Sequence, residues 1–155
     1  MNTHKRHIFF DFDGTIISSS RVVFHCVARL VSDYLGKSVT LEEAREKYSP
    51  DHHIGFANYG IELTQELAQE FNQRWPKIAL ENMDLYEPFP GVIELLDELK
   101  HRGHELYLWT ARERISTQAI LDHLNLRSYF VDIRCGDDTK VKPHPEGLLQ
   151  MGAHL

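Results

Sequence analysis

The chain has 155 residues, a formal net charge of −6, 42% hydrophobic residues and 26% charged residues, which indicates one soluble globular domain with room for a small insertion. No basic patch offsets the acidic balance, so we expect neither nucleic acid nor a membrane surface as a partner. Cys26 and Cys135 stand far apart in apolar stretches and are expected to be two buried thiols, which argues against a disulfide framework and for a reduced, cytoplasmic setting.

The first half of the chain predicts one strand followed by a long helical block. The apolar run at residues 7–11 ends at an acid and is predicted to be a short buried strand. Apolar residues then recur at helical spacing and capping residues mark helix starts, so we expect helices over residues 21–35, after Thr40 and after Thr64. The stretch 51–60 is expected to be a loop or a broken helix.

The second half of the chain alternates helix and strand. Two further strands are predicted at residues 106–109 and 130–135, and helices at residues 92–99, at 115–124 and after Pro145. This alternation predicts an α/β fold with a Rossmann-like parallel sheet and right-handed crossovers. The helical block is too long for a simple crossover. We therefore expect an inserted helical subdomain at residues 18–87, and an α/β core at residues 1–17 and 88–155.

Polar residues follow the predicted strand ends, where parallel sheets bind ligands. Asp11 and Asp13 leave the first strand into a turn at Gly14, and two such carboxylates can divide the roles of nucleophile and proton donor. Gly14 lets the backbone approach a ligand, Thr110 follows the second strand and can donate to a phosphate oxygen, and Lys142 is a compact cation suited to a phosphoryl group. The pattern favours phosphate chemistry assisted by an oxygen-seeking divalent cation.

Each of these signals has an ordinary explanation when it stands alone. Alone, an Asp-x-Asp-Gly run is a calcium-type loop or a plain turn about as often as it is a catalytic site. A threonine after a strand is usually a cap or part of a turn. Their order at three successive strand ends is what favours a phosphate site. The ten histidines carry no comparable pattern. His52 and His53 are adjacent and His101 and His104 straddle a helix end, so a histidine metal site is not expected.

The same residues resemble a known family. The run from Phe10 to Ile16, the strand that ends at Thr110, and the segment from Gly136 to Pro145 are similar to motifs of the haloacid-dehalogenase-like hydrolase superfamily. Residues 18–87 are similar to the helical cap that these enzymes insert after their first strand. The resemblance covers nearly the whole chain and implies a phosphatase rather than a dehalogenase, because an acid stands at Asp13.

The resemblance also implies a role for each motif residue. Asp11 would be the nucleophile that forms an aspartyl-phosphate. Asp13 would act as general acid and base, and its main-chain carbonyl and the Asp11 carboxylate would bind Mg²⁺. Thr110 and Gly14 would contact the substrate phosphate, and Lys142 would steady the charge on Asp11 and the phosphate. The implied activity is a Mg²⁺-dependent hydrolysis of a small phosphorylated metabolite.

The chain departs from the family pattern toward its C-terminal end. The family's fourth motif, a strand that ends in Gly-Asp and another acid, would follow Lys142 and is absent, and the run 136–138 precedes Lys142 and does not replace it. The α/β core is therefore expected to be incomplete, with fewer carboxylates for Mg²⁺ and with an open edge at strand 7–11 that invites self-association. We expect either a fragment of a longer protein or a truncated relative that a partner completes.

Besides the phosphatase, two functions stay open. The chain can be a catalytically impaired or inactive member of the fold that works as a binding or assembly module, or a phosphomutase of the same family. Substrate identity is expected to depend mostly on the helical cap. Candidates for contact with the non-phosphate end of a substrate, each as readily a surface or packing residue, are Asp51, His52, His53, Phe56, Asn58 and Arg112.

Overall fold

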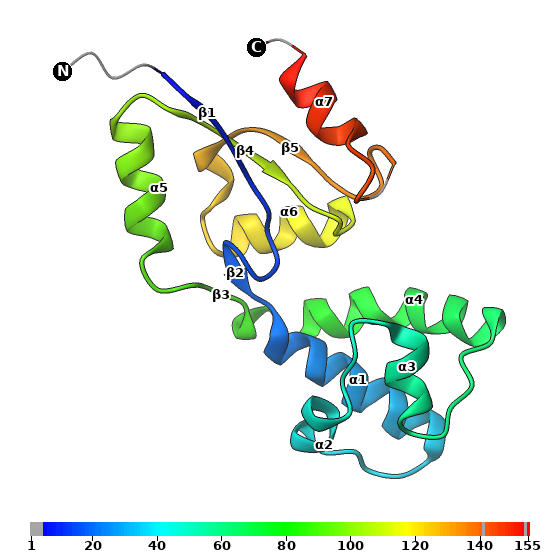
Figure 1. Ribbon diagram of the computed structural model, residues 1–155. Coiled ribbons are helices and arrows are strands. Elements are labelled where there is room, and N and C mark those ends of the chain that lie inside the picture. The colour runs from blue at the N-terminus through cyan, green and yellow to red at the C-terminus, as the bar shows by residue number, and fades with distance from the viewer. Residues whose placement is uncertain (1–4, 141, 154) are drawn as a thin grey trace. The chain divides into compact units, whose positions relative to one another are not determined.

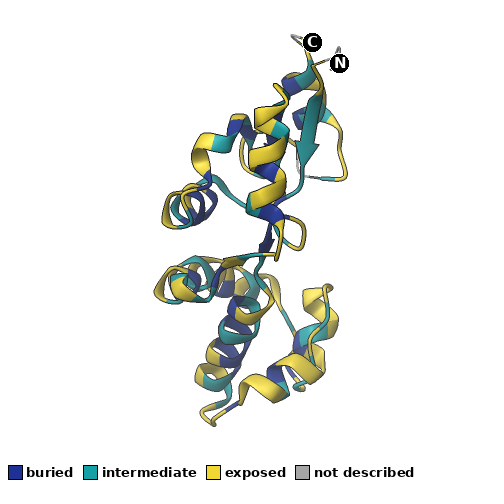
Figure 2. Ribbon diagram, turned by 90° about the vertical axis from the view of Figure 1, so that its left-hand side faces the viewer, coloured by how far each residue is buried: buried dark blue, intermediate teal, exposed yellow. Residues whose placement is uncertain are grey.

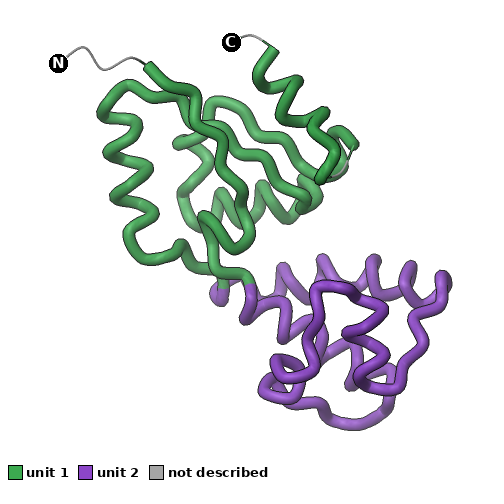
Figure 3. Tube along the Cα trace, viewed as in Figure 1, with its two compact units in different colours: residues 1–19, 86–155 green, residues 20–85 purple. Residues whose placement is uncertain are grey.

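The computed structural model describes residues 5–140, 142–153 and 155. The chain divides into two compact units, one formed by residues 20–85 and the other by the segments before and after them (Figure 3). No helix among the described residues is long and apolar enough to cross a membrane.

The first unit is built on a parallel sheet. Its strands are β1 (His7–Phe10), β4 (Glu105–Trp109) and β5 (Phe130–Arg134), in the order β1-β4-β5. Both neighbouring pairs are parallel. The helices of this unit are α5 (Val92–His101), α6 (Arg114–His123) and α7 (Glu146–Gly152) (Figure 1). The predicted α/β fold with a parallel sheet is confirmed, and the carboxyl ends of the strands lie at one edge of the sheet.

The central strand β4 carries the core of this unit. Leu106 and Leu108 of β4 are fully buried, and α5 and α7 both contact this strand. β1 was predicted to be a buried strand, but its four residues are only partly covered. The reason is its place at the end of the sheet, because it pairs with β4 on one side and with no other described strand. Self-association through that edge stays a prediction.

Two short strands lie where the chain passes between the units, and they were not predicted. β2 (Ile17–Ser18) pairs antiparallel with β3 (Glu87–Pro88). Strands of two residues are too short to show alternation in a sequence, so only their pairing partner defines them. The two 3-10 turns were missed for the same reason; they are η1 (Met83–Leu85) and η2 (Arg127–Tyr129).

The second unit is helical. Its elements are α1 (Ser20–Leu35), α2 (Leu41–Glu46), α3 (His52–Ala57) and α4 (Gln65–Glu81). The capping residues act as predicted, since the Thr40 hydroxyl accepts the Glu43 N–H at 3.1 Å and the Thr64 hydroxyl accepts the Leu67 N–H at 3.3 Å. α1 packs on α2 and α4, and six of its sixteen residues are buried. Figure 2 colours the chain by burial.

Both cysteines are free and buried, one in each unit. The prediction of two buried thiols is therefore confirmed for Cys26 and Cys135. Burial raises the pKa of the Cys135 thiol, because an apolar surrounding disfavours the thiolate. Both sulfurs are thus shielded from solvent, whereas a reactive thiol nucleophile needs exposure.

Candidate active site

The centre of the site is an ion pair at the end of β1. Asp11 follows β1 directly, and its Oδ1 accepts a hydrogen bond from Nζ of Lys142 at 2.8 Å. The same Nζ lies 4.4 Å from the ring centroid of Trp109, the last residue of β4. The aromatic face and the carboxylate together hold the ammonium group. The structure thus brings together two residues that the sequence predicted to act on one phosphoryl group.

A tight turn presents the two acids on either side of a buried residue. Phe12 is fully buried, and its carbonyl accepts main-chain hydrogen bonds from residues 15–17 at 2.9–3.2 Å. Gly14 has a φ of 78°, which favours glycine, and its N–H is donated within the turn at 2.9 Å. Asp11 and Asp13 are therefore held by a rigid turn. The predicted contact of Gly14 with phosphate stays a prediction. What the structure shows is that Gly14 shapes this turn.

Main-chain contacts hold the segment after β4 against the segment after β5. Thr110 is 2% exposed, and its Oγ1 accepts the N–H of Arg112 at 3.1 Å. This contact leaves its O–H group as a donor. The carbonyl of Arg112 accepts the N–H of Gly136 at 2.8 Å. A Cβ atom on Gly136 would lie 2.1 Å from the carbonyl oxygen of Ala111, so the two backbones can approach this closely only because residue 136 is a glycine.

The second acid has a partner that the sequence did not predict. Arg112 donates from Nε to Oδ2 of Asp13 at 2.9 Å and from Nη2 to Oδ1 at 2.6 Å. Arg112 also donates from Nη1 to Ser116 Oγ at 3.2 Å and to Tyr86 Oη at 3.4 Å. Burial alone would lower the pKa of Arg112, but the hydrogen bonds to Asp13 outweigh it and hold this pKa above its usual range.

The acidic run after β5 has a structural task. Asp137 accepts the N–H of Arg114 at 2.9 Å, and Asp138 accepts the Arg114 Nε–H at 2.8 Å and the Cys135 N–H at 2.7 Å. The Arg114 hydrogen bonds are the main reason why the pKa of Asp138 lies below its usual range. These contacts brace the loop that leads to Lys142. That the run does not replace the family's fourth motif stays a prediction.

The oxygens available to a metal are few. Among the described residues, no group of three or more histidines, cysteines and acids is placed to hold an ion. Asp11 is the best ligand present, since its side chain is 43% exposed and no described donor reaches its Oδ2. Mg²⁺ commonly keeps several waters and takes one or two carboxylates together with substrate phosphate. The residues therefore fit such a loosely held cation, but they do not form a complete protein cage.

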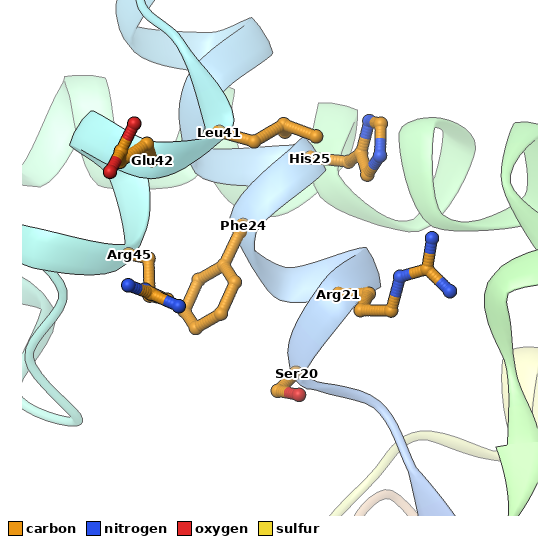
Figure 4. Close-up of a pocket in the computed structure, with 7 residues that line it drawn as sticks. All are labelled: Ser20, Arg21, Phe24, His25, Leu41, Glu42 and Arg45. Carbon is orange, nitrogen blue, oxygen red and sulfur yellow. The ribbon is translucent and has the colours of Figure 1, made fainter.

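The helical unit has an open pocket of about 440 Å³, lined by Ser20, Arg21, Phe24, His25, Leu41, Glu42 and Arg45 (Figure 4). The guanidinium groups of Arg21 and Arg45 lie on either side of Phe24 in this view and do not converge on one point. None of the predicted substrate-contacting residues lines this pocket. His52 and Phe56 instead line a cavity of about 10 Å³. The His52 ring stacks on the Trp75 ring, with the ring centroids 5.8 Å apart. Contacts of these residues with a substrate stay a prediction.

The comparisons with known proteins extend over most of the chain. The model of the haloacid dehalogenase-like hydrolase family matches residues 8–155. A phosphoglycolate phosphatase of Aquifex aeolicus is 30% identical over 154 residues, which cover 94% of this chain and 68% of that protein. The pyrophosphatase PpaX of Bacillus anthracis is 26% identical over 143 residues, 91% of this chain and 64% of that protein. The chain thus spans about two thirds of the length of these relatives.

Solved structures share the fold. A predicted phosphoglycolate phosphatase from Haemophilus somnus superimposes with a TM-score of 0.78 at 20% identity, covering 99% of this chain and 72% of that one. A haloacid dehalogenase-like family hydrolase from Streptococcus pneumoniae gives a TM-score of 0.71 at 23% identity, with coverage of 99% and 70%. The resemblance that the motifs indicated is confirmed, as is the prediction of a hydrolase of this type. The chain belongs to the haloacid dehalogenase-like hydrolase family.

Proposed function

We propose that the protein is a phosphatase that hydrolyses a small phosphorylated metabolite through an aspartyl-phosphate on Asp11. The observation that carries this proposal is the 2.8 Å contact between Asp11 Oδ1 and Lys142 Nζ at the end of β1. One carboxylate oxygen is held by a cation, while no described donor reaches the other oxygen. Asp13 stands two residues further along the same turn. The names of the curated relatives, several of which are phosphatases, support the same class of reaction.

The chemistry divides into two steps. In the first, an oxygen of Asp11 attacks phosphorus, the bond from phosphorus to the leaving oxygen breaks, and Asp13 gives that oxygen a proton. In the second, water attacks the phosphorus of the aspartyl-phosphate, its proton passes to Asp13, and Asp11 leaves as a carboxylate. Lys142 offsets the negative charge that gathers on Asp11 and the phosphoryl oxygens. The Thr110 O–H group donates to one of those oxygens.

We further propose that Mg²⁺ assists the reaction. The carboxylate of Asp11 and the main-chain carbonyl of Asp13 would hold it, and when bound it would supply charge compensation between the anionic nucleophile and the anionic phosphate. Because the protein supplies so few ligands, its affinity for Mg²⁺ is expected to depend on the substrate phosphate. The helical unit at residues 20–85 is proposed to act as the cap that governs substrate choice.

Phosphate release from an aryl phosphate tests this function. We expect release in the presence of Mg²⁺, loss of release with a chelator, and recovery when Mg²⁺ is added back. Asp11→Asn should abolish release and also the acid-stable gain of one phosphoryl group in the mass of the quenched protein. Asp122→Asn is the matched control, because Asp122 is exposed on α6, away from the strand ends.

Unchanged release by the Asp11→Asn variant would remove Asp11 as the nucleophile. A wild-type chain that binds a partner stably but turns over no phosphate ester would favour the alternative of a non-catalytic binding module.

A further inference from the structure

Arg112 holds Asp13 in one orientation. Its Nε and Nη2 donate to the two different oxygens of the carboxylate, at 2.9 and 2.6 Å. The Arg112 side chain is 15% exposed and the Asp13 side chain 32% exposed. A two-point contact between a planar guanidinium and a planar carboxylate fixes direction as well as distance. Asp13 therefore cannot rotate without losing at least one of these bonds.

The guanidinium group is itself fixed on its other side. Nη1 donates to Ser116 Oγ at 3.2 Å and to Tyr86 Oη at 3.4 Å, and the guanidinium carbon lies 5.4 Å from the centroid of the Tyr86 ring. The main chain of Arg112 is held as well, since Thr110 accepts the Arg112 N–H and Gly136 donates to the Arg112 carbonyl. Each of the three guanidinium nitrogens thus has an acceptor within the protein. This leaves Arg112 poorly placed to bind a substrate phosphate directly.

We propose that Arg112 is a positioning residue that orients Asp13 to accept the proton of the attacking water in the second step. The inference rests on the proposed function. A carboxylate oxygen offers two acceptor directions, and Arg112 occupies one on each oxygen, so the remaining directions stay open to water. The water's oxygen joins phosphorus, the bond from phosphorus to Asp11 breaks, and the proton goes to Asp13.

This role predicts a specific kinetic pattern with a nitrophenyl phosphate, whose leaving group departs without needing a proton. Arg112→Met should lower kcat by ~10–100-fold, because a misplaced general base loses much of its effect. KM should fall in nearly the same proportion, so that kcat/KM stays within about threefold of the wild type. The fraction of protein trapped as aspartyl-phosphate after an acid quench should rise, since formation continues while hydrolysis slows.

Three further variants sharpen the test. Arg112→Lys keeps the charge but donates from a single nitrogen, so it cannot reproduce the contact from two nitrogens to the two oxygens of Asp13. It should show the same pattern with a smaller loss of kcat. Ser116→Ala removes a support of the guanidinium and should show it more weakly still. Arg102→Met is the matched control, because Arg102 is exposed and pairs with Glu98 one helical turn earlier. It should leave kcat, KM and the trapped fraction unchanged.

Other patterns would overturn the inference. A raised KM with a reduced kcat/KM in Arg112→Met would mean that Arg112 binds the phosphate. Unchanged kcat and trapped fraction in both Arg112→Lys and Ser116→Ala would refute positioning even if Arg112→Met failed to fold. Absence of turnover by the wild-type protein would remove the proposed function and this inference with it. Normal wild-type turnover with any of the wrong patterns would remove this inference alone.

Discussion

The close contact at Gly136 offers a direct test of how the site is assembled. In Gly136→Ala the new Cβ would lie 2.1 Å from the carbonyl oxygen of Ala111 and 2.9 Å from its carbonyl carbon. Both are backbone atoms, so no flexible side chain can move aside. Reaching even a tight van der Waals separation requires one backbone segment to move by roughly 1 Å. The segment that moves includes Arg112, whose carbonyl accepts the Gly136 N–H at 2.8 Å.

The cost follows from two known effects. Overpacking of this kind costs about 1–3 kcal/mol, and the strained hydrogen bond costs about 1 kcal/mol more. Alanine recovers about 0.4–1 kcal/mol by restricting the unfolded chain. We therefore expect a net loss of about 1–3 kcal/mol in the free energy of unfolding, which for a chain of this size lowers Tm by roughly 2–4 °C per kcal/mol.

Urea unfolding followed by circular dichroism measures this loss. Gly152→Ala is the matched control, because a Cβ atom added there would meet nothing within 4 Å and because this glycine ends helix α7. That variant should be neutral or up to about 1 kcal/mol more stable. Equal stability of Gly136→Ala and Gly152→Ala would refute the claim that the second and third strand ends are locked by backbone contact.

Two more predictions follow from the ion pairs. Lys142→Met should reduce kcat/KM by ~10²–10³-fold. It should shift the free energy of unfolding by only about 0–1 kcal/mol, because the ion pair with Asp11 is partly exposed. A loss of stability without a loss of activity would contradict this role of Lys142. Hydrogen bonds from Arg114 hold the pKa of Asp138 below its usual range. Asp138 should therefore stabilise the fold above its unfolded-chain pKa of ~3.9 and lose that contribution as the pH falls through the lower, folded-state pKa. Acid unfolding of Asp138→Asn should accordingly depend less on pH in this range than that of the wild type, and identical pH dependence would argue against the pair.

The sequence predicted the parts of the fold that local pattern controls. The strand before Asp11 and the helix caps at Thr40 and Thr64 depend on residues close together in the chain. The caps lie where they were expected, and the strand ends one residue earlier, at Phe10. The exposure of β1 was not predictable in the same way. Its four residues are apolar or aromatic apart from His7, yet they are only partly covered, because the burial of a strand depends on its neighbours in the sheet.

The candidate site shows the same division. Asp11 and Lys142 were expected to meet because their motifs follow strand ends, and parallel strands bring such ends together. Arg112 was expected only as a residue that can touch a substrate. Its pairing with Asp13 depends on a turn set by Thr110 and on a close backbone approach at Gly136. No spacing rule links residues 99 positions apart, so the three-dimensional structure was needed to find this partner.

The two acids of the turn differ in how firmly they are held, and the difference matches their proposed roles. Among the described residues, the Asp11 side chain accepts one hydrogen bond, from Lys142, and keeps an oxygen that no described donor reaches. A nucleophile needs such an oxygen, because it must form a new bond. Asp13 has both oxygens held by the guanidinium of Arg112, whose side chain is 15% exposed. A general base gains from fixed direction more than from freedom to move. Sites that use two carboxylates assign their roles by giving each a different surrounding. Here Lys142 sets the surroundings of Asp11, and Arg112 sets those of Asp13.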